Sequence, residues 1–551
     1  MKGYAAIAKI LKMEGVELVT GFPNNALQDT IAEEGIRLVT FRTERAAVEA
    51  ADGYTRISFG QRIGVSTVMF GPGIEAAFSG VRQAYSDGVP ILVLPTGDER
   101  RRVSTHPNFD TLRVYREATK WSDTLSFADR IPETMRRAFT YLKTGRPGPV
   151  LVNIPVDVGG EELDEATFQY RPVKSAKPAG DPDDIRELAR ILIASKNPVI
   201  RAGQGVLYAC AGEELMALAE LLQIPVFTTM NAKGAFPENH PLALGTGGRT
   251  RTKMVVHFLD KADLIFAIGS SCTREQMTYP IPSGKTILQA TIDERDINKD
   301  YEIEQAAIGD ARLVLKQLIE EVQRQIGPQG RKGDGAVAKE ISAVKEEWLR
   351  EWMPKLTSDE TPINPYRVIW DMMQVMDSES TIVVHDSGTP RDQLVPFWQC
   401  VTPGSYIGYG KDHMLGSGLG LALGAKLAQP KKLVVYVCGE GAFGQNGMDF
   451  ETAVRENIPI LNIVFNNGTL SMSKVVNPIA SKRYGMNVVS GQYAKIAEGL
   501  GGYAERIDQP AEIIPALERA KKMVDSGKAT LLEIMDKEEI DLPYVDPVPK
   551  L

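Results

Sequence analysis

Cysteine is scarce in this sequence of 551 residues. The chain has four cysteines, Cys210, Cys272, Cys400 and Cys438, and no two of them show the CxxC spacing that is common in zinc sites. Small secreted proteins that depend on disulfides use a far larger share of cysteine. The spacing therefore argues against a zinc site or a disulfide framework, and we expect a protein of a reducing compartment, the cytoplasm.

The sequence also lacks long apolar runs and an excess of basic residues. No uninterrupted apolar run approaches the length of about 18 residues that a membrane helix needs, and no basic start is followed by a short apolar segment. The formal net charge of -8 offers no attraction to nucleic acids or anionic membranes. We therefore expect a small molecule as the ligand, with no nucleic acid and no membrane as partners.

Short continuous apolar segments alternate with helical patterns along the whole chain. Examples are IGVSTVMF, DLIFAIGS and KLVVYVCG. Strands that are apolar on both faces are typical of parallel sheets covered by helices. A proline- and charge-rich segment at 170–184 and a glycine-rich segment at 327–340 interrupt the pattern like linkers. We predict an α/β protein with three doubly wound parallel-sheet domains, at 1–170, 185–326 and 360–545.

The segment that contains Gly439-Glu440-Gly441 and Asn466-Asn467 has the features of a metal and diphosphate site. Each of the two groups directly follows an apolar strand. Because ligands bind beyond the carboxyl ends of parallel strands, Glu440 and Asn467 would converge if these strands are neighbours. Their oxygen atoms suit Mg²⁺, which would keep positions free for phosphate oxygens and water. The alternative is an ordinary glycine-rich turn with a capping acid.

These two groups, with 24 residues between them, resemble the motif of thiamine-diphosphate (ThDP) enzymes, which usually begins GDG. FRTERAAVEAADGYTR (41–56) resembles the segment that carries the cofactor-activating glutamate, and FGPG (70–73) resembles the SGPG turn of the family. AELLQIPVFTTMNAKGAFPENHPLALG (219–245) resembles the middle domain of the acetolactate synthase-like group. MLGSGLGLALGAKLA (414–428) resembles the stretch that lines the cofactor pyrimidine. The chain is thus similar over essentially its whole length to acetolactate synthase-like large catalytic subunits.

The resemblance implies roles for individual residues. Glu44 would bond the pyrimidine ring and activate the cofactor, although an acid at a helix N-terminus is also favoured by the helix dipole. Leu415 would wedge the two cofactor rings into a bent conformation. Mg²⁺ would be held by Glu440, Asn467 and the carbonyl of Thr469. The other residues implied to contact the cofactor are Gly71, Gly73, Asp386, Ser387, Gly388, Thr389, His413, Gly439, Gly441, Ala442 and Leu470.

Some positions bear on the substrate and depart from the family pattern. His106 and Asp110 lie where related enzymes bring polar residues to the substrate, so both are catalytic candidates, although a lone histidine is more often structural. Acetolactate synthases usually carry glutamine where Asp110 follows Phe109, and tryptophan where Val476 stands. Glu440 is one methylene longer than the usual aspartate. Asp110 and Val476 argue against the branched-chain biosynthetic enzyme itself, whereas Glu440 bears on the assignment of the metal site.

The resemblance implies a ThDP- and Mg²⁺-dependent lyase or carboligase that acts on a 2-oxo acid or a related carbonyl compound. Decarboxylation of a 2-oxo acid would give a carbanion that passes to a proton or to a second carbonyl. The family also implies active sites shared between subunits, and hence a homodimer or homotetramer. The alternatives are a 2-hydroxyacyl-CoA lyase, an oxalyl-CoA-type decarboxylase, and a non-catalytic homologue.

The central part of the chain leaves a second ligand open. RAGQGVLYA (201–209) follows a strand and has a glycine-rich turn, which suits FAD, a CoA nucleotide or neither. A dinucleotide-dependent oxidoreductase is disfavoured, because GFPNNALQ (21–28) does not supply the GxGxxG pattern after the first strand.

Overall fold

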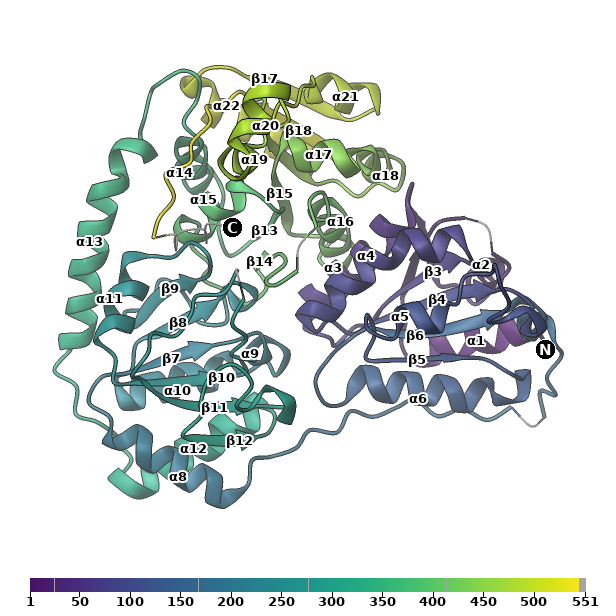
Figure 1. The fold of residues 1–551 in the computed structure, drawn as a ribbon, viewed down its shortest axis with the longest axis horizontal. Coiled ribbons are helices and arrows are strands. Elements are labelled where there is room, and N and C mark those ends of the chain that lie inside the picture. Colours follow the sequence, from purple (N-terminus) through teal and green to yellow (C-terminus); the bar gives the residue numbers. More distant parts are fainter. Residues whose placement is uncertain (24, 167, 276, 413, 545–551) are drawn as a thin grey trace.

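A computed structural model describes residues 1–23, 25–166, 168–275, 277–412 and 414–544. The chain forms three parallel six-stranded sheets with helices packed against them (Figure 1). We call the parts around these sheets the N-terminal, central and C-terminal domains. The predicted α/β class with three doubly wound parallel sheets is confirmed. In the described part of the chain, no helix is both long enough and apolar enough to cross a membrane.

The N-terminal domain is drawn in purple and blue in Figure 1. Its strands are β1 (Leu18–Gly21), β2 (Arg37–Thr40), β3 (Gly64–Met69), β4 (Ile91–Gly97), β5 (Trp121–Thr124) and β6 (Val150–Pro155). Its helices are α1 (Gly3–Met13), α2 (Leu27–Glu33), α3 (Glu44–Ile57), α4 (Pro72–Asp87), α5 (Thr111–Tyr115), α6 (Ile131–Lys143) and α7 (Val156–Gly160). The order in the sheet is β2-β1-β3-β4-β6-β5.

The central domain has the strand order of dinucleotide-binding folds. Its strands are β7 (Pro198–Ala202), β8 (Val226–Thr229), β9 (Ala243–Gly247), β10 (Leu264–Ile268), β11 (Thr286–Thr291) and β12 (Gln305–Ile308). Its helices are α8 (Pro182–Ala194), α9 (Gly205–Tyr208), α10 (Gly212–Leu222), α11 (Lys253–Lys261) and α12 (Ala311–Ile326). The order β12-β11-β10-β7-β8-β9 reverses direction between β7 and β10, and ligands bind at such a switch point.

The C-terminal domain repeats the topology of the N-terminal domain. Its strands are β13 (Thr381–His385), β14 (Tyr406–Ile407), β15 (Leu433–Gly439), β16 (Leu461–Phe465), β17 (Tyr503–Ile507) and β18 (Thr530–Ile534). Its helices are α14 (Pro365–Val375), α15 (Thr389–Phe397), α16 (Gly418–Ala428), α17 (Glu440–Asn446), α18 (Phe450–Arg455), α19 (Ser471–Val476), α20 (Pro478–Tyr484), α21 (Tyr493–Gly499) and α22 (Ile513–Asp525). The order β14-β13-β15-β16-β18-β17 matches the N-terminal order strand for strand. The sequence shows no close repeat, so the two halves share topology without close sequence similarity.

The two predicted linkers differ in structure. The chain at 170–181 forms no helix or strand and runs from the N-terminal to the central domain (Figure 1). The glycine-rich segment leads into α13 (Ala336–Leu356), whose Trp348 is buried and stacks on Phe397 of α15 with ring centroids 4.8 Å apart. This second segment therefore ends in a helix that is part of the hydrophobic core.

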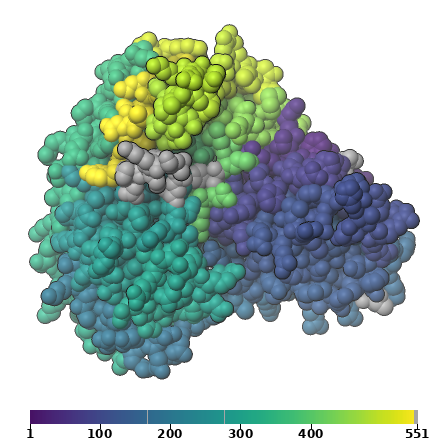
Figure 2. Space-filling view, in the orientation of Figure 1, coloured from purple at the N-terminus to yellow at the C-terminus, as the bar shows by residue number. Residues whose placement is uncertain are grey.

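The N-terminal and C-terminal domains meet where α3 packs against α16. Small residues let the two backbones approach closely: a Cβ atom on Gly424 would lie 2.0 Å from the carbonyl oxygen of Ala50. A Cβ atom on Gly53 would lie 2.2 Å from the carbonyl oxygen of Leu421. Figure 2 shows the purple and blue N-terminal surface in direct contact with the green C-terminal surface. The predicted cofactor segment at 414–428 thus also forms a domain interface.

Candidate functional site

The switch point of the C-terminal sheet gathers most of the predicted site residues. The strand order changes direction between β13 and β15, and ligands of such sheets bind beyond the carboxyl ends of these strands. Asp386 follows β13, Gly439 ends β15, and Asn467 comes soon after β16, which pairs with β15 in parallel. The strands before Glu440 and Asn467 are therefore neighbours, which is the condition for these two residues to converge.

Glu440 and Asn467 point oxygen atoms at the same place. The backbone N–H of Thr469 donates to Glu440 Oε1 at 2.9 Å and lies 3.2 Å from Asn467 Oδ1. Glu440 is the first residue of α17, and Gly439 is its N-cap. The two side chains thus converge, and a carboxylate with an amide oxygen is a pair that hard divalent cations bind.

Two buried carboxylates at this point fit a bound cation. Glu440 is 3% exposed and Asp536, two residues after β18, is 6% exposed. Burial raises the pKa of both carboxyl groups, and the charge of Glu440 raises the pKa of Asp536 further. Within the described ranges, neither acid forms a salt bridge with a basic side chain. Since buried charges are costly without a counter-charge, the donor set fits a divalent cation. Those same ranges contain no group of three or more His, Cys, Asp or Glu residues that could bind a metal, so phosphate oxygens would have to complete the coordination.

The carboxylate of Asp386 is hydrogen-bonded to other groups of the protein. It accepts hydrogen bonds from Tyr436 Oη at 2.7 Å and from the backbone N–H groups of Ser387, Gly416 and Gly418 at 2.6, 2.9 and 2.7 Å. Burial raises its pKa, and these donors act against that rise. Asp386 therefore fixes the loop that carries the predicted cofactor residues before α16.

The turn after Asp386 leads directly into α15. Gly388 has φ = 118°, a value that side chains rarely adopt, and is the N-cap of α15, which begins at Thr389. The first turn of α15 lies directly after β13, and its unpaired N–H groups can bind an anion there, although Pro390 contributes none. Ser387, Gly388 and Thr389 thus follow the carboxyl end of β13, and their contact with a diphosphate stays a prediction.

Gly441 lies between Leu415 and Leu470, two leucines that are predicted to contact the cofactor. A Cβ atom on Gly441 would lie 2.4 Å from Leu470 Cδ2 and 3.8 Å from Leu415 Cδ2. Only glycine leaves room for both side chains at this position. Ala442 is buried, and its carbonyl oxygen packs against Gly416 in the loop before α16. His413 lies outside the described residues.

The N-terminal candidates Glu44, Gly71 and Gly73 lie together. Glu44 begins α3, and a Cβ atom on Gly73 in α4 would lie only 3.0 Å from Glu44 Oε1. Gly71 has φ = 61° and caps α4. Arg45, next to Glu44, links this group to the C-terminal domain, because its Nη2 donates to the carbonyl oxygen of Leu415 at 2.8 Å.

His106 and Asp110 lie on the loop before α5. His106 is exposed, and Asp110 is the N-cap of α5, where it accepts from Arg113 N at 3.1 Å and from Ser104 Oγ at 2.9 Å. These bonds are local to the loop. In the described part of the chain, neither candidate is hydrogen-bonded to the residues around β13 and β15.

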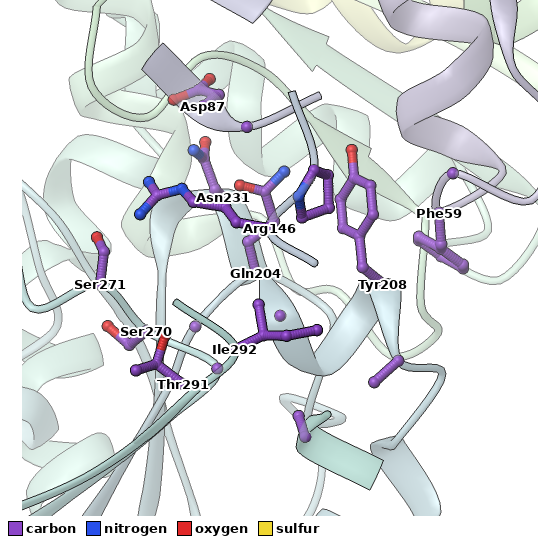
Figure 3. Close-up of a pocket in the computed structure, with 18 of the residues that line it drawn as sticks. Phe59, Asp87, Arg146, Gln204, Tyr208, Asn231, Ser270, Ser271, Thr291 and Ile292 are labelled. Carbon is purple, nitrogen blue, oxygen red and sulfur yellow. The ribbon is translucent and has the colours of Figure 1, made fainter. Parts of the chain in front are cut away.

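The central domain has a cavity at its own switch point. It has a volume of about 610 Å³ and lies between the N-terminal and central domains, with Arg146, Gln204, Tyr208 and Asn231 around it (Figure 3). The turns after β7 and β10 form its floor and contact each other, since a Cβ atom on Gly203 would lie 2.3 Å from the carbonyl oxygen of Gly269. The packing of these two turns against each other therefore accounts for the glycines of the RAGQGVLYA segment without a ligand.

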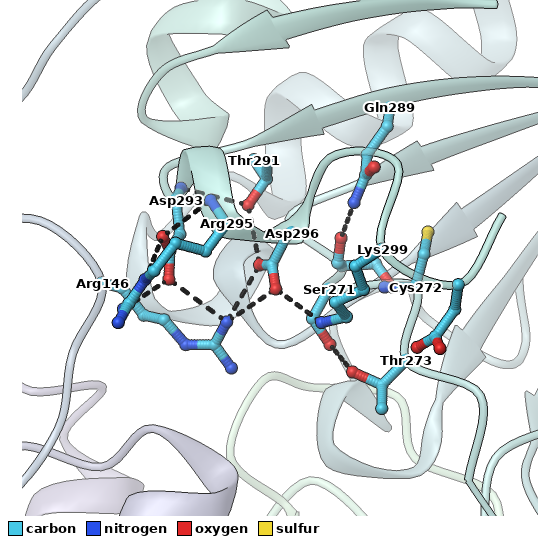
Figure 4. Close-up of polar contacts among 12 residues, drawn as sticks. Arg146, Ser271, Cys272, Thr273, Gln289, Thr291, Asp293, Arg295, Asp296 and Lys299 are labelled. Carbon is cyan, nitrogen blue, oxygen red and sulfur yellow. Dashed lines mark hydrogen bonds and ion pairs between the residues drawn. The ribbon is translucent and has the colours of Figure 1, made fainter. Parts of the chain in front are cut away.

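An ion-pair network closes one side of this cavity. Arg146 Nη1 donates to both carboxylate oxygens of Asp296 at 2.8 and 3.0 Å and to Asp293 at 3.4 Å (Figure 4). Lys299 Nζ donates to Asp296 Oδ1 at 2.7 Å. The network links the N-terminal domain to the central domain and holds the cavity wall in place.

Three family models match the chain in order. They are described as "Thiamine pyrophosphate enzyme, N-terminal TPP binding domain" for residues 1–115, "Thiamine pyrophosphate enzyme, central domain" for 185–318, and "Thiamine pyrophosphate enzyme, C-terminal TPP binding domain" for 386–534. Thiamine pyrophosphate is another name for thiamine diphosphate.

Curated relatives match along nearly the whole chain. A probable acetolactate synthase large subunit of Methanocaldococcus jannaschii is 33% identical over 99% of this chain and 94% of that protein. The acetolactate synthase large subunit of Buchnera aphidicola subsp. Schizaphis graminum is 30% identical over 97% of this chain and 94% of its own length. The acetolactate synthase isozyme 3 large subunit of Escherichia coli is 28% identical over 97% of this chain and 94% of its own length. The chain therefore belongs to the thiamine-diphosphate enzymes, in the group of the acetolactate synthase large subunits.

Proposed function

We propose that this protein is a Mg²⁺-dependent ThDP carboligase that decarboxylates a 2-oxo acid and joins the product to a second carbonyl compound. The group to which the chain belongs supports the reaction class. The proposal of a metal rests on two buried carboxylates at the switch point, Glu440 and Asp536, which have no basic partner in the described part of the chain. Glu440, Asn467 and Thr469 would hold the cation.

The chain's own residues would prepare the site for the cofactor. Bound ThDP supplies a nucleophilic carbon and then an electron sink. Glu44 would hold a proton between its carboxylate and the pyrimidine ring, with Gly73 leaving room beside it. Leu415 and Leu470 would exclude water from the reacting carbon and keep the rings bent. The N-terminus of α15 would bind the diphosphate.

The substrate is proposed from the same group. A 2-oxo acid is the first choice, and Val476, which is 47% exposed in the single chain, leaves more space than the tryptophan usual at this position. The alternative is a 2-hydroxyacyl-CoA lyase or an oxalyl-CoA-type decarboxylase. The cavity of the central domain has the volume of a nucleotide site, and we propose it as the place for FAD or a CoA nucleotide.

We also propose a homodimer or homotetramer with shared active sites. Apolar side chains are exposed on and after α19 and α20, and a second subunit would cover them. Their exposed fractions are 49% for Val475, 68% for Ile479, 80% for Tyr484 and 65% for Val488. In such an assembly, exposed His106 would lie near the active site of the partner subunit. The four free cysteines support a cytoplasmic location.

The test is turnover of a 2-oxo acid. The protein is incubated with ThDP, Mg²⁺ and pyruvate, and both CO₂ release and the coupled product are measured. We expect turnover in the parent and a loss of about 100-fold or more in Glu44→Gln, which keeps the shape but not the charge of the side chain. Turnover of acyl-CoA compounds but not of 2-oxo acids would favour the alternative. No turnover of either class by cofactor-bound protein would refute the proposal.

A further inference from the structure

The amide of Asn467 has two different ends, and only its oxygen can bind a cation. Its Nδ2 donates to Asp536 Oδ2 at 3.3 Å. Its Oδ1 faces the N–H of Thr469 at 3.2 Å, beside Glu440. An ionised carboxylate can only accept hydrogen bonds, so Asp536 can hold only the nitrogen end of this amide. The oxygen end is thereby turned toward Glu440.

Asp536 is buried with half of its bonding capacity unused. It follows β18 and is 6% exposed, and in the described part of the chain its Oδ1 is a buried atom without a hydrogen-bond partner. Buried carboxylate oxygens without partners are costly, and each such atom in a native protein calls for a physical reason. A cation between Asn467 and Glu440 supplies that reason, because it attracts the negative charge of Asp536.

The neighbouring asparagine provides an internal comparison. Asn466 Nδ2 donates to Glu533 Oε1 at 2.6 Å, so the two adjacent amides are each held by an acid in or just after β18. The second oxygen of Glu533 accepts from the N–H of Ala494 at 2.9 Å. Glu533 is therefore fully paired within the protein, and Asp536 is not. This difference singles out Asp536 as the acid with a charge left for a ligand.

We propose that Asp536 is the positioning residue of the cation site. It fixes which end of the Asn467 amide faces the cation, and it adds a second negative charge behind that ligand. Outer partners of this kind typically change metal affinity by about 10- to 100-fold. The inference rests on the proposed Mg²⁺ site at Glu440 and Asn467.

The test compares Asp536→Asn with Glu533→Gln. Metal-stripped protein is titrated with Mg²⁺ at a fixed ThDP concentration, and ThDP binding is followed by calorimetry. We expect Asp536→Asn to raise the Mg²⁺ concentration for half-maximal binding by about 10-fold or more, because the new amide no longer selects one end of Asn467. Glu533→Gln should stay close to the parent. A purely structural role would lower thermal stability in both variants and leave the Mg²⁺ dependence unchanged.

Two further results decide the inference. If Asp536→Asn alone does not fold, the double variant Asn467→Asp with Asp536→Asn reverses the hydrogen bond and keeps an oxygen toward the cation, so its Mg²⁺ dependence should lie near that of the parent. A parental Mg²⁺ dependence in Asp536→Asn would overturn the inference while leaving the proposed function intact. A parent protein without Mg²⁺-dependent ThDP binding would overturn both.

Discussion

Removing the charge of Glu49 should make the protein more stable at alkaline pH. Glu49 lies in α3 at the contact with α16 and is completely buried. It accepts from Arg45 Nε at 2.8 Å and is 3.4 Å from Asn446 Nδ2. Burial raises the pKa of Glu49 from its ordinary value of 4.5 to about 8, although Arg45 acts in the opposite direction. The perturbation is Glu49→Gln, which keeps the acceptor for Arg45.

The size of the effect follows from this pKa difference. Because the folded-state pKa lies above the unfolded value, the protonated carboxyl group favours folding. Its contribution is fully present below about pH 4.5 and is lost as the pH rises through about 8. The full loss corresponds to roughly 5 kcal/mol at about 1.4 kcal/mol per pH unit. Glutamine has no proton to lose and stays neutral at every pH, so the variant should be spared this loss.

Thermal unfolding of parent and variant at a series of pH values measures the effect. We expect nearly equal Tm values at pH 5 and a Tm several degrees higher for Glu49→Gln at pH 8.5. Exposed Glu498, replaced by glutamine, is the matched control and should follow the parent at every pH. Parallel pH profiles for the parent and Glu49→Gln would refute the reasoning, because they would mean that Arg45 fully offsets the cost of burial.

Three other substitutions test the packing around the site. Gly424→Ala would place its Cβ atom 2.0 Å from the carbonyl oxygen of Ala50, so we expect a loss of about 1–3 kcal/mol and a lower Tm. Gly499→Ala, on α21 with open space around it, is the control and should raise Tm slightly or leave it unchanged. Gly441→Ala would push Leu470 away from its position, so calorimetry should show weaker ThDP binding with little change in Tm. Equal binding in Gly441→Ala and the parent would mean that Leu470 does not touch the cofactor.

The convergence of Glu440 and Asn467 could be predicted from the sequence. Both follow apolar strands that are close together in the chain, and in parallel sheets the carboxyl ends of neighbouring strands meet at one edge. The pairing of β15 with β16 satisfies this condition. The proximity of Glu44 and Gly73 could be anticipated only from the resemblance to the family, because α3 and α4 are separated by a strand.

Asp536 could not be found from the sequence. It is 69 residues from Asn467 and reaches it because β18 inserts between β16 and β17, an order that no local pattern shows. The inward orientation of Asp386 could not be predicted either, since its donors include Tyr436 of β15 and Gly416 in the loop before α16. Such contacts depend on tertiary packing rather than on local sequence.

The most direct test of the account is calorimetric binding of ThDP to metal-stripped protein, with and without Mg²⁺, for the parent and for Glu440→Ala. We expect the parent to bind ThDP only when Mg²⁺ is present, and we expect Glu440→Ala to lose this metal-dependent binding. Equal binding of ThDP by Glu440→Ala and the parent, or no binding by the parent with Mg²⁺ present, would contradict the assignment of the cation site to the switch point between β13 and β15.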